Sequence, residues 1–188
     1  MRNSAGGFLS TIAGAVLLSR TVSSGHYYQP PYDLLSPLLQ GCELLGRTPQ
    51  GLLNSTTTFA YLVVWAVTGA LMGLFSRPGW NTCRTTLWMG FFAALFATVS
   101  RLLVDPAFWT SSGRNLELLL TFVTFSMITQ IGLIGALPVS TLLSRLMLGH
   151  DAPLPTKIET VCTCGAVFRS IPILCSECGR TLRTGHEE

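Results

Sequence analysis

Four cysteines near the end of the chain form the pattern with the most specific chemistry in this sequence. They occur in two short motifs, Cys-Thr-Cys-Gly and Cys-Ser-Glu-Cys-Gly, with ten residues between the second cysteine and the third. The glycine after each pair lets the backbone turn tightly, so that its amide groups can point at sulfur. Four thiolates delivered in this way predict one tetrahedral metal ion in a structural site, and zinc is the usual metal there. The expected ligands are Cys162, Cys164, Cys175 and Cys178.

Other interpretations of these cysteines stay open. Iron bound by the same four thiolates, as in rubredoxin, is one alternative, and two disulfides in an outward-facing tail are another. A catalytic zinc is disfavoured because four cysteines leave no position open for water. His150 and His186 flank the motifs and could replace a cysteine, although solvated histidines near a chain end are the simpler interpretation. Cys42 and Cys83 stand alone and are interpreted as small apolar residues.

The second motif continues as CxxCGxxL through Leu182, and in this the tail resembles the zinc-ribbon family. The resemblance covers about residues 158 to 184 and implies a small β unit built around structural zinc. Two features depart from the family pattern, because the first motif is CxC and the spacer is shorter than the usual ~15–20 residues. Strand formers such as Val167 and Phe168, a turn at 170–172 and a short strand from Thr181 fit this unit. So small a unit needs a metal to fold.

The composition of the chain points to a membrane as its solvent. Of 188 residues, 48% are hydrophobic and only 11% are charged, whereas soluble domains carry about a quarter charged residues. The net charge of +3 comes from scattered arginines, so no basic patch indicates nucleic-acid binding. Because a helix needs about 20 apolar residues to cross a bilayer, spans are predicted at 55–75, 85–104 and 118–143. Pro138 is expected either to kink the last span or to mark where it leaves the membrane.

The first apolar segment has three interpretations. A short or tilted span at about 5–20 is favoured, while a signal peptide or a mitochondrial presequence within residues 1–24 are the alternatives. The predicted fold is therefore an all-α polytopic membrane bundle of about four transmembrane helices over residues 1–148. A linker at 149–157 and a small C-terminal β zinc ribbon at 158–188 follow. Each part is expected to fold independently of the other.

Arginine and lysine in the loops predict the orientation. With both termini inside, eight basic residues lie on the inner side and four on the outer side. Free thiolates also require a reducing compartment, which places both ends on the cytosolic side of the membrane. Which membrane this is stays open, with a mitochondrial membrane as one alternative.

The predicted function follows partly by elimination. No Asp, Glu, Lys or His falls within a predicted span, which argues against transport, and no catalytic motif is present. The prediction is a non-enzymatic accessory, scaffold or assembly subunit of a membrane complex, with the ribbon as docking module. Its expected partners are the bilayer and other membrane or cytosol-side proteins, and an oligomer of the chain is left open. A GxxxG at Gly69 and Gly73 allows close helix contact, either inside the chain or with another subunit.

Two other function classes are kept. One is an enzyme or carrier acting on lipid-like substrates, with a site around Gln130 or among the charged residues near one membrane face. A cluster of surface salt bridges explains these charges equally well, and Gln130 is expected to bond to a neighbouring helix. The other is a sensor of zinc or of redox state. The charged residues are Arg101, Asp105, Arg114 and Glu117.

Overall fold

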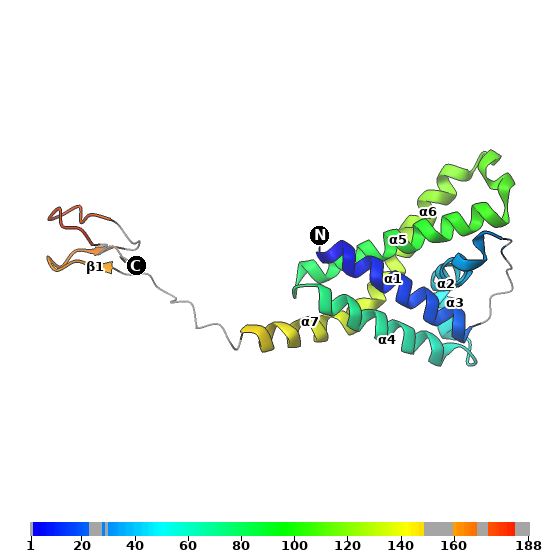
Figure 1. Ribbon diagram of the computed structural model, residues 1–188, viewed down its shortest axis with the longest axis horizontal. Coiled ribbons are helices and arrows are strands. Elements are labelled where there is room, and N and C mark those ends of the chain that lie inside the picture. Colours follow the sequence, from blue (N-terminus) through cyan, green and yellow to red (C-terminus); the bar gives the residue numbers. More distant parts are fainter. Residues whose placement is uncertain (1, 23–27, 29, 149–159, 169–172, 183–188) are drawn as a thin grey trace. The chain divides into compact units, whose positions relative to one another are not determined.

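The structure is a computed structural model, and it describes residues 2–22, 28, 30–148, 160–168 and 173–182. The chain divides into two compact units, Met1–Leu148 and Gly149–Glu188 (Figure 1). We call them the helical unit and the cysteine unit. The predicted linker at 149–157 and the predicted turn at 170–172 lie outside the described residues, as do His150 and His186.

The helical unit is a bundle whose helices begin and end at recognisable local signals. Proline occupies the first turn of α2 and of α3, where its missing N–H costs nothing. Gly79 precedes α5 with φ of +89°, a backbone conformation that favours glycine. The elements are α1 (Arg2–Thr21), η1 (Tyr32–Leu35), α2 (Ser36–Gly46), α3 (Thr48–Leu53), α4 (Thr58–Phe75), α5 (Trp80–Val104), η2 (Pro106–Thr110), α6 (Arg114–Ile128), η3 (Thr129–Gly132) and α7 (Leu133–Leu148).

Three helical stretches of the described chain are long and apolar enough to cross a membrane. They are Thr58–Phe75, Trp80–Val104 and Arg114–Met147, and they match the predicted spans at 55–75, 85–104 and 118–143. The segment predicted as a first span is also a helix, α1, but it is not among the three. Glycine, serine and threonine fill much of the buried side of α1, and these residues lower its hydropathy. A fourth crossing therefore stays a prediction.

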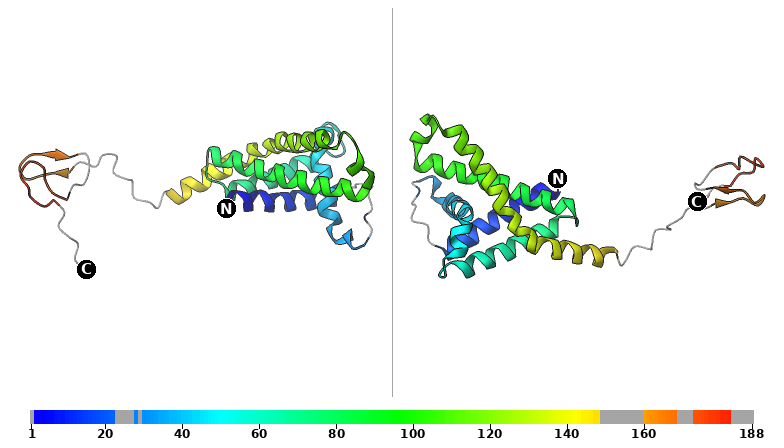
Figure 2. Two further views of the ribbon diagram at one scale, coloured as in Figure 1. Left: turned by 90° about the horizontal axis from the view of Figure 1, so that it is seen from above. Right: turned by 180° about the vertical axis from the view of Figure 1, so that it is seen from behind.

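Small residues let α1 pack closely against α2, α4 and α5 (Figure 2). A Cβ atom at Gly41 of α2 would overlap the backbone carbonyl of Ala15 in α1. A Cβ at Gly7 would lie 2.7 Å from the backbone nitrogen of Met89 in α5. Both glycines are thus required by helix-to-helix contact, and the core of the unit forms where these helices meet.

The third membrane-crossing stretch is interrupted at η3. Its 34 residues would extend about 51 Å as one straight helix, compared with about 30 Å for the bilayer core. The stretch changes direction at η3, so that α6 lies along α5 and α7 lies along α4 (Figure 2). The interruption of the stretch lies at η3, and α7 continues through Pro138 to Leu148, so the helix does not end at the proline. A kink at Pro138 stays a prediction.

The GxxxG motif of α4 is used inside the chain. A Cβ at Gly69 would lie 2.9 Å from the carbonyl oxygen of Gly132, and one at Gly73 would lie 2.7 Å from that of Ala136. The two glycines therefore allow the backbones of η3 and α7 to approach α4 closely. This close contact accounts for the motif without a second copy of the chain.

The described part of the cysteine unit contains a short antiparallel hairpin. Strands β1 (Thr160–Val161) and β2 (Val167–Phe168) pair with Val161 opposite Val167. A single bridge joins Leu174 to Thr181, where one more short strand was predicted. This amount of pairing is less than a complete zinc ribbon, so the family resemblance stays a prediction.

Candidate metal centre

The first pair of cysteines lies on the turn between β1 and β2. The N–H of Gly165 donates to the carbonyl of Cys162 at 2.9 Å, and the N–H of Cys162 donates to the carbonyl of Ala166 at 2.9 Å. Gly165 adopts φ of +91°, which side chains with a Cβ rarely tolerate. The glycine predicted to shape this motif is therefore necessary for its turn.

The second pair of cysteines lies on a turn of the same design. The N–H of Gly179 donates to the carbonyl of Cys175 at 2.8 Å, and Gly179 has φ of +70°. The N–H of Cys175 donates to the carbonyl of Arg180, also at 2.8 Å. The Arg180 guanidinium reaches the Thr163 hydroxyl at 3.1 Å, which connects this turn to the first.

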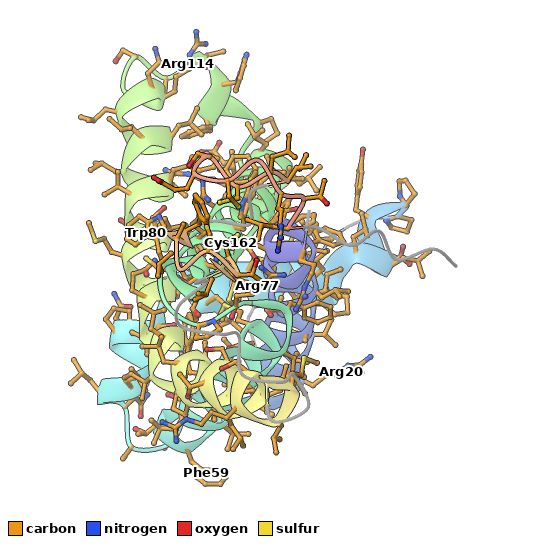
Figure 3. The ribbon with its side chains drawn as sticks, turned by 90° about the vertical axis from the view of Figure 1, so that its left-hand side faces the viewer. Arg20, Phe59, Arg77, Trp80, Arg114 and Cys162 are labelled. Carbon is orange, nitrogen blue, oxygen red and sulfur yellow. The ribbon has the colours of Figure 1, made fainter. Side chains whose placement is uncertain are left out.

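The two turns bring all four sulfur atoms together, in the region of Cys162 in Figure 3. The four Sγ atoms lie within 4.8 Å of one another. The distance from Cys162 to Cys178 is 3.5 Å and that from Cys164 to Cys175 is 3.6 Å, so each close contact joins the two turns. A disulfide requires about 2.05 Å, whereas four sulfurs bound at about 2.3 Å to one tetrahedral ion lie about 3.8 Å apart. This group of cysteines could hold a metal ion.

The sulfur atoms also influence one another's ionisation. Hydrogen bonding by the backbone N–H of Cys164, with the neighbouring thiols, lowers the pKa of Cys162 to about 6. For Cys164 the N–H of Ala166 lowers the pKa, but the sulfurs of Cys162 and Cys178 outweigh it and raise the pKa to about 12. One thiolate thus discourages the next, because four negative charges this close repel one another. A bound cation is what would let all four ionise together.

The surroundings of the sulfur group are partly apolar and open. Cys162 and Cys175 are buried, while Cys164 and Cys178 are exposed. A hollow of about 470 Å³ beside the exposed pair is lined in part by Val167, Phe168 and Glu177. Among the described residues of this small unit, four aliphatic side chains are more than half exposed, namely Val161, Val167, Ile173 and Leu174.

In the helical unit, the charged residues considered for a lipid headgroup have partners of their own. Arg101 forms an ion pair of 2.6 Å with Glu117 and covers the Phe108 ring at 4.5 Å. The Asp105 carboxylate accepts the N–H of Ala107 at the start of η2. Arg114 donates to the carbonyl of Trp109 at 2.6 Å and lies over its ring. These contacts form a local surface cluster, which is the simpler of the two sequence interpretations.

Gln130 bonds across helices, as the sequence predicts. Its Oε1 accepts the Thr86 hydroxyl at 2.9 Å and the Cys83 thiol at 3.6 Å, and its Nε2 donates to the Ser126 carbonyl at 2.9 Å. The side chain therefore ties η3 to α5 rather than lining an open site. Cys42 is fully buried in the helical unit.

Sequence reasoning missed a polar cluster around Glu43. The Ser100 hydroxyl donates to Glu43 Oε1, and the Tyr28 hydroxyl lies 2.5 Å from that of Ser100. Burial raises the pKa of Tyr28, so its phenol stays protonated. Glu43 is the one acidic residue of α2, and leucines lie near it on both sides in the sequence. An acidic residue in so apolar a segment is a sequence signal for a hydrogen-bonding partner elsewhere in the chain.

Comparison with protein-family models, curated proteins and solved structures yields no match for this chain. The three stretches long and apolar enough to cross a membrane and the cysteine group are therefore the basis for assigning a function.

Proposed function

We propose that this protein is a non-enzymatic accessory, scaffold or assembly subunit of a membrane protein complex. In this proposal the helical unit lies in the bilayer, and the cysteine unit binds zinc and docks a partner protein. The observation that carries the proposal is a group of four thiols, enough to fill a tetrahedral site, in a unit whose described aliphatic side chains are largely exposed. A closed site gives rigidity without a reactive position, and exposed aliphatic side chains give a contact surface.

Zinc fits the four cysteines better than other metals. Thiolate ligands in a tetrahedral arrangement favour zinc or iron, and zinc is the usual choice where the site is structural. The pairing of β1 with β2 involves only two residues in each strand, which is too little to hold the unit together by itself. The free energy of zinc binding would therefore be the main source of its stability.

The docking surface is centred on the hairpin of the cysteine unit. Directly paired residues of an antiparallel hairpin project to the same face, so Val161 and Val167 form one apolar patch. The hollow beside Cys164 and Cys178 lies next to Val167 and could receive an apolar side chain. Aliphatic residues left this exposed on a small unit are typical of a protein-binding surface.

The groups considered for a lipid substrate favour the accessory role over an enzyme or carrier. Gln130 and Arg101 make their contacts within the chain, and Glu117, the one acidic residue of the three described stretches, is paired with Arg101 at the start of α6. We further propose that both termini lie on the reducing side of the membrane, as the excess of basic residues on that side favours.

A zinc or redox sensor is the second candidate, and one observation favours it. Cys164 and Cys178 are exposed, so an oxidant could reach two of the four sulfurs. Release of zinc at oxidant concentrations that leave partner binding intact would support the sensor. Loss of the partner together with the zinc would leave the docking role as the simpler account.

The test uses the full-length protein, purified in mild detergent with the proteins that accompany it. The variant Val161→Ser, Val167→Ser removes the apolar patch without touching a sulfur, so zinc should stay bound while the partner is lost. Ser176→Ala, an exposed change in the same unit that does not line the hollow, is the control and should keep both. A stoichiometric partner retained by the valine variant would contradict the docking surface, and absence of zinc in the unaltered protein would contradict the metal site.

A further inference from the structure

The two ends of the helical unit differ in charge. Its four acidic residues belong to η1, α2 and the region where α5 leads into α6, whereas no acidic residue occurs between Glu43 and Asp105. The start of α1 and the turn from α4 to α5 form the other end (Figure 1). That end carries Arg2, Arg77 and Arg84, all exposed. Within the described residues, none of these three guanidinium groups forms an ion pair.

The three arginines share one hollow of about 640 Å³, which we call the arginine hollow. Arg2 comes from α1, Arg77 from the turn after α4, and Arg84 from α5. The amide of Asn3 donates to Asn81 at 3.4 Å and so connects α1 to α5 at the hollow. Arg77, labelled in Figure 3, belongs to the turn between the end of α4 at Phe75 and the start of α5 at Trp80. The hollow thus has a defined wall made by three separate segments.

Helix geometry adds to the positive potential of the hollow. Both α1 and α5 begin there, and the first turn of a helix has N–H groups without intrahelical partners and a partial positive charge. Arginine next to such a positive end is unfavourable unless an anion lies nearby. Two helix starts and three arginines without a carboxylate therefore call for an anion from outside the chain.

An apolar hollow of about 350 Å³ adjoins the arginine hollow. Its lining is Arg84, Leu87, Trp88 and Phe91, and it shares Arg84 and Trp88 with the arginine hollow. The Trp88 ring lies 5.7 Å from that of Phe91, which makes a continuous aromatic wall along α5. A ligand that fits both hollows has an anionic head and an apolar chain.

We propose that the arginine hollow binds the phosphate headgroup of an anionic phospholipid, with an acyl chain along Trp88 and Phe91. Basic hollows between membrane helices suit such headgroups, and exposed tryptophan at a helix end marks the interface where they lie. Trp80, which is 72% exposed, begins α5 at this level. A free phosphate ion would use the arginines but not the apolar hollow. The site is separate from the cysteine unit, so it does not depend on the proposed docking role.

The experiment measures lipid binding to the delipidated full-length protein in neutral detergent by native mass spectrometry. Dioleoylphosphatidylglycerol should bind more tightly than dioleoylphosphatidylcholine. The variant Arg77→Gln, Arg84→Gln should bind phosphatidylglycerol about 30-fold more weakly, equivalent to about 2 kcal/mol, because each basic residue near such a lipid contributes about 1 kcal/mol. The matched control, Arg20→Gln with Arg47→Gln, removes the same charge from two exposed arginines elsewhere and should leave binding unchanged.

Three results would overturn the proposal. Equal affinity for the two lipids would show that the headgroup is not recognised, and an equal loss in the control would show an unspecific charge effect. Competition by inorganic phosphate at the lipid's own concentration would assign the hollow to a free anion. If circular dichroism shows that the double variant has lost helix, the single variant Arg84→Gln takes its place, with an expected loss of about fivefold.

Discussion

Removing two sulfurs from the cysteine group should abolish metal binding without unfolding the helical unit. The variant Cys175→Ser, Cys178→Ser takes one sulfur from each of the two close contacts, which join Cys164 to Cys175 and Cys162 to Cys178. Both substitutions lie on the second turn. The first turn keeps its two cysteines, but two sulfur ligands are too few to complete a tetrahedral site. We expect about one zinc per chain in the unaltered protein and none in this variant.

Loss of zinc should unfold the cysteine unit alone, because the chain is divided into two compact units. Structural zinc sites in small peptides supply about 10–16 kcal/mol, which a hairpin with two residues in each strand cannot replace. The cysteine unit should therefore unfold, and its N–H groups at Cys162, Gly165, Cys175 and Gly179 should lose protection. Every residue assigned to an α-helix lies in the other unit, so circular dichroism at 222 nm should not change.

Elemental analysis, hydrogen exchange and circular dichroism on one preparation test this reasoning. The matched control is Cys42→Ala with Cys83→Ala, which also removes two cysteines but should keep the full zinc content. Full zinc in the Cys175→Ser, Cys178→Ser variant would refute the ligand assignment. A large loss of helix would instead refute the independence of the two units.

Three other predictions concern the packing of the bundle and its orientation. Gly41→Ala should destabilise the helical unit by about 1–3 kcal/mol or more, because the new methyl group would overlap the Ala15 carbonyl. Gly113→Ala meets nothing closer than 3.9 Å and should have little effect on the same thermal unfolding curve. Gln130→Leu should cost about 0.6 kcal/mol by removing the bond to Thr86, and no loss in a detergent unfolding assay would mean that this bond is not stabilising. A membrane-impermeant thiol reagent should label the two exposed cysteines of the metal centre only after the cells are permeabilised. Labelling of these cysteines in intact cells would contradict the proposed orientation.

The sequence predicts well what depends on local chemistry. The three long apolar stretches become membrane-length helices because 20 or so apolar residues satisfy their backbone only as a helix in lipid. Gly165 and Gly179 adopt positive φ because each follows a cysteine pair on a tight turn. In both cases the signal lies within a few neighbouring residues.

The sequence predicts poorly what depends on distant partners. Pro138 is the usual signal for a kink, but a proline is tolerated in a membrane helix where neighbouring groups compensate. The interruption at η3 arises instead beside Gln130, whose partner Thr86 lies 44 residues away. Glu43 finds Ser100 at a separation of 57 residues. No local pattern specifies such pairs, since they depend on how the helices are packed.

The arginine hollow shows the same limit at the level of a site. Arg2 lies far in sequence from Arg77 and Arg84. Considered by itself in the sequence, each of the three is only a basic loop residue that helps to predict the orientation of the chain. The fold places all three around one hollow, where their charges add and an anion becomes favourable. Counting the arginines in each loop predicts which side of the membrane they lie on. It does not predict that the three come together around one hollow.

The two proposed binding surfaces can be separated because they belong to different compact units. The hairpin patch depends on the cysteine turns, whereas the arginine hollow depends on the packing of α1 against α5. The valine variant should therefore lose the protein partner and keep phosphatidylglycerol, and the arginine variant should do the reverse. If the arginine variant also lost the partner, lipid binding would be a condition for assembly, and the helical unit would contribute directly to the partner interface.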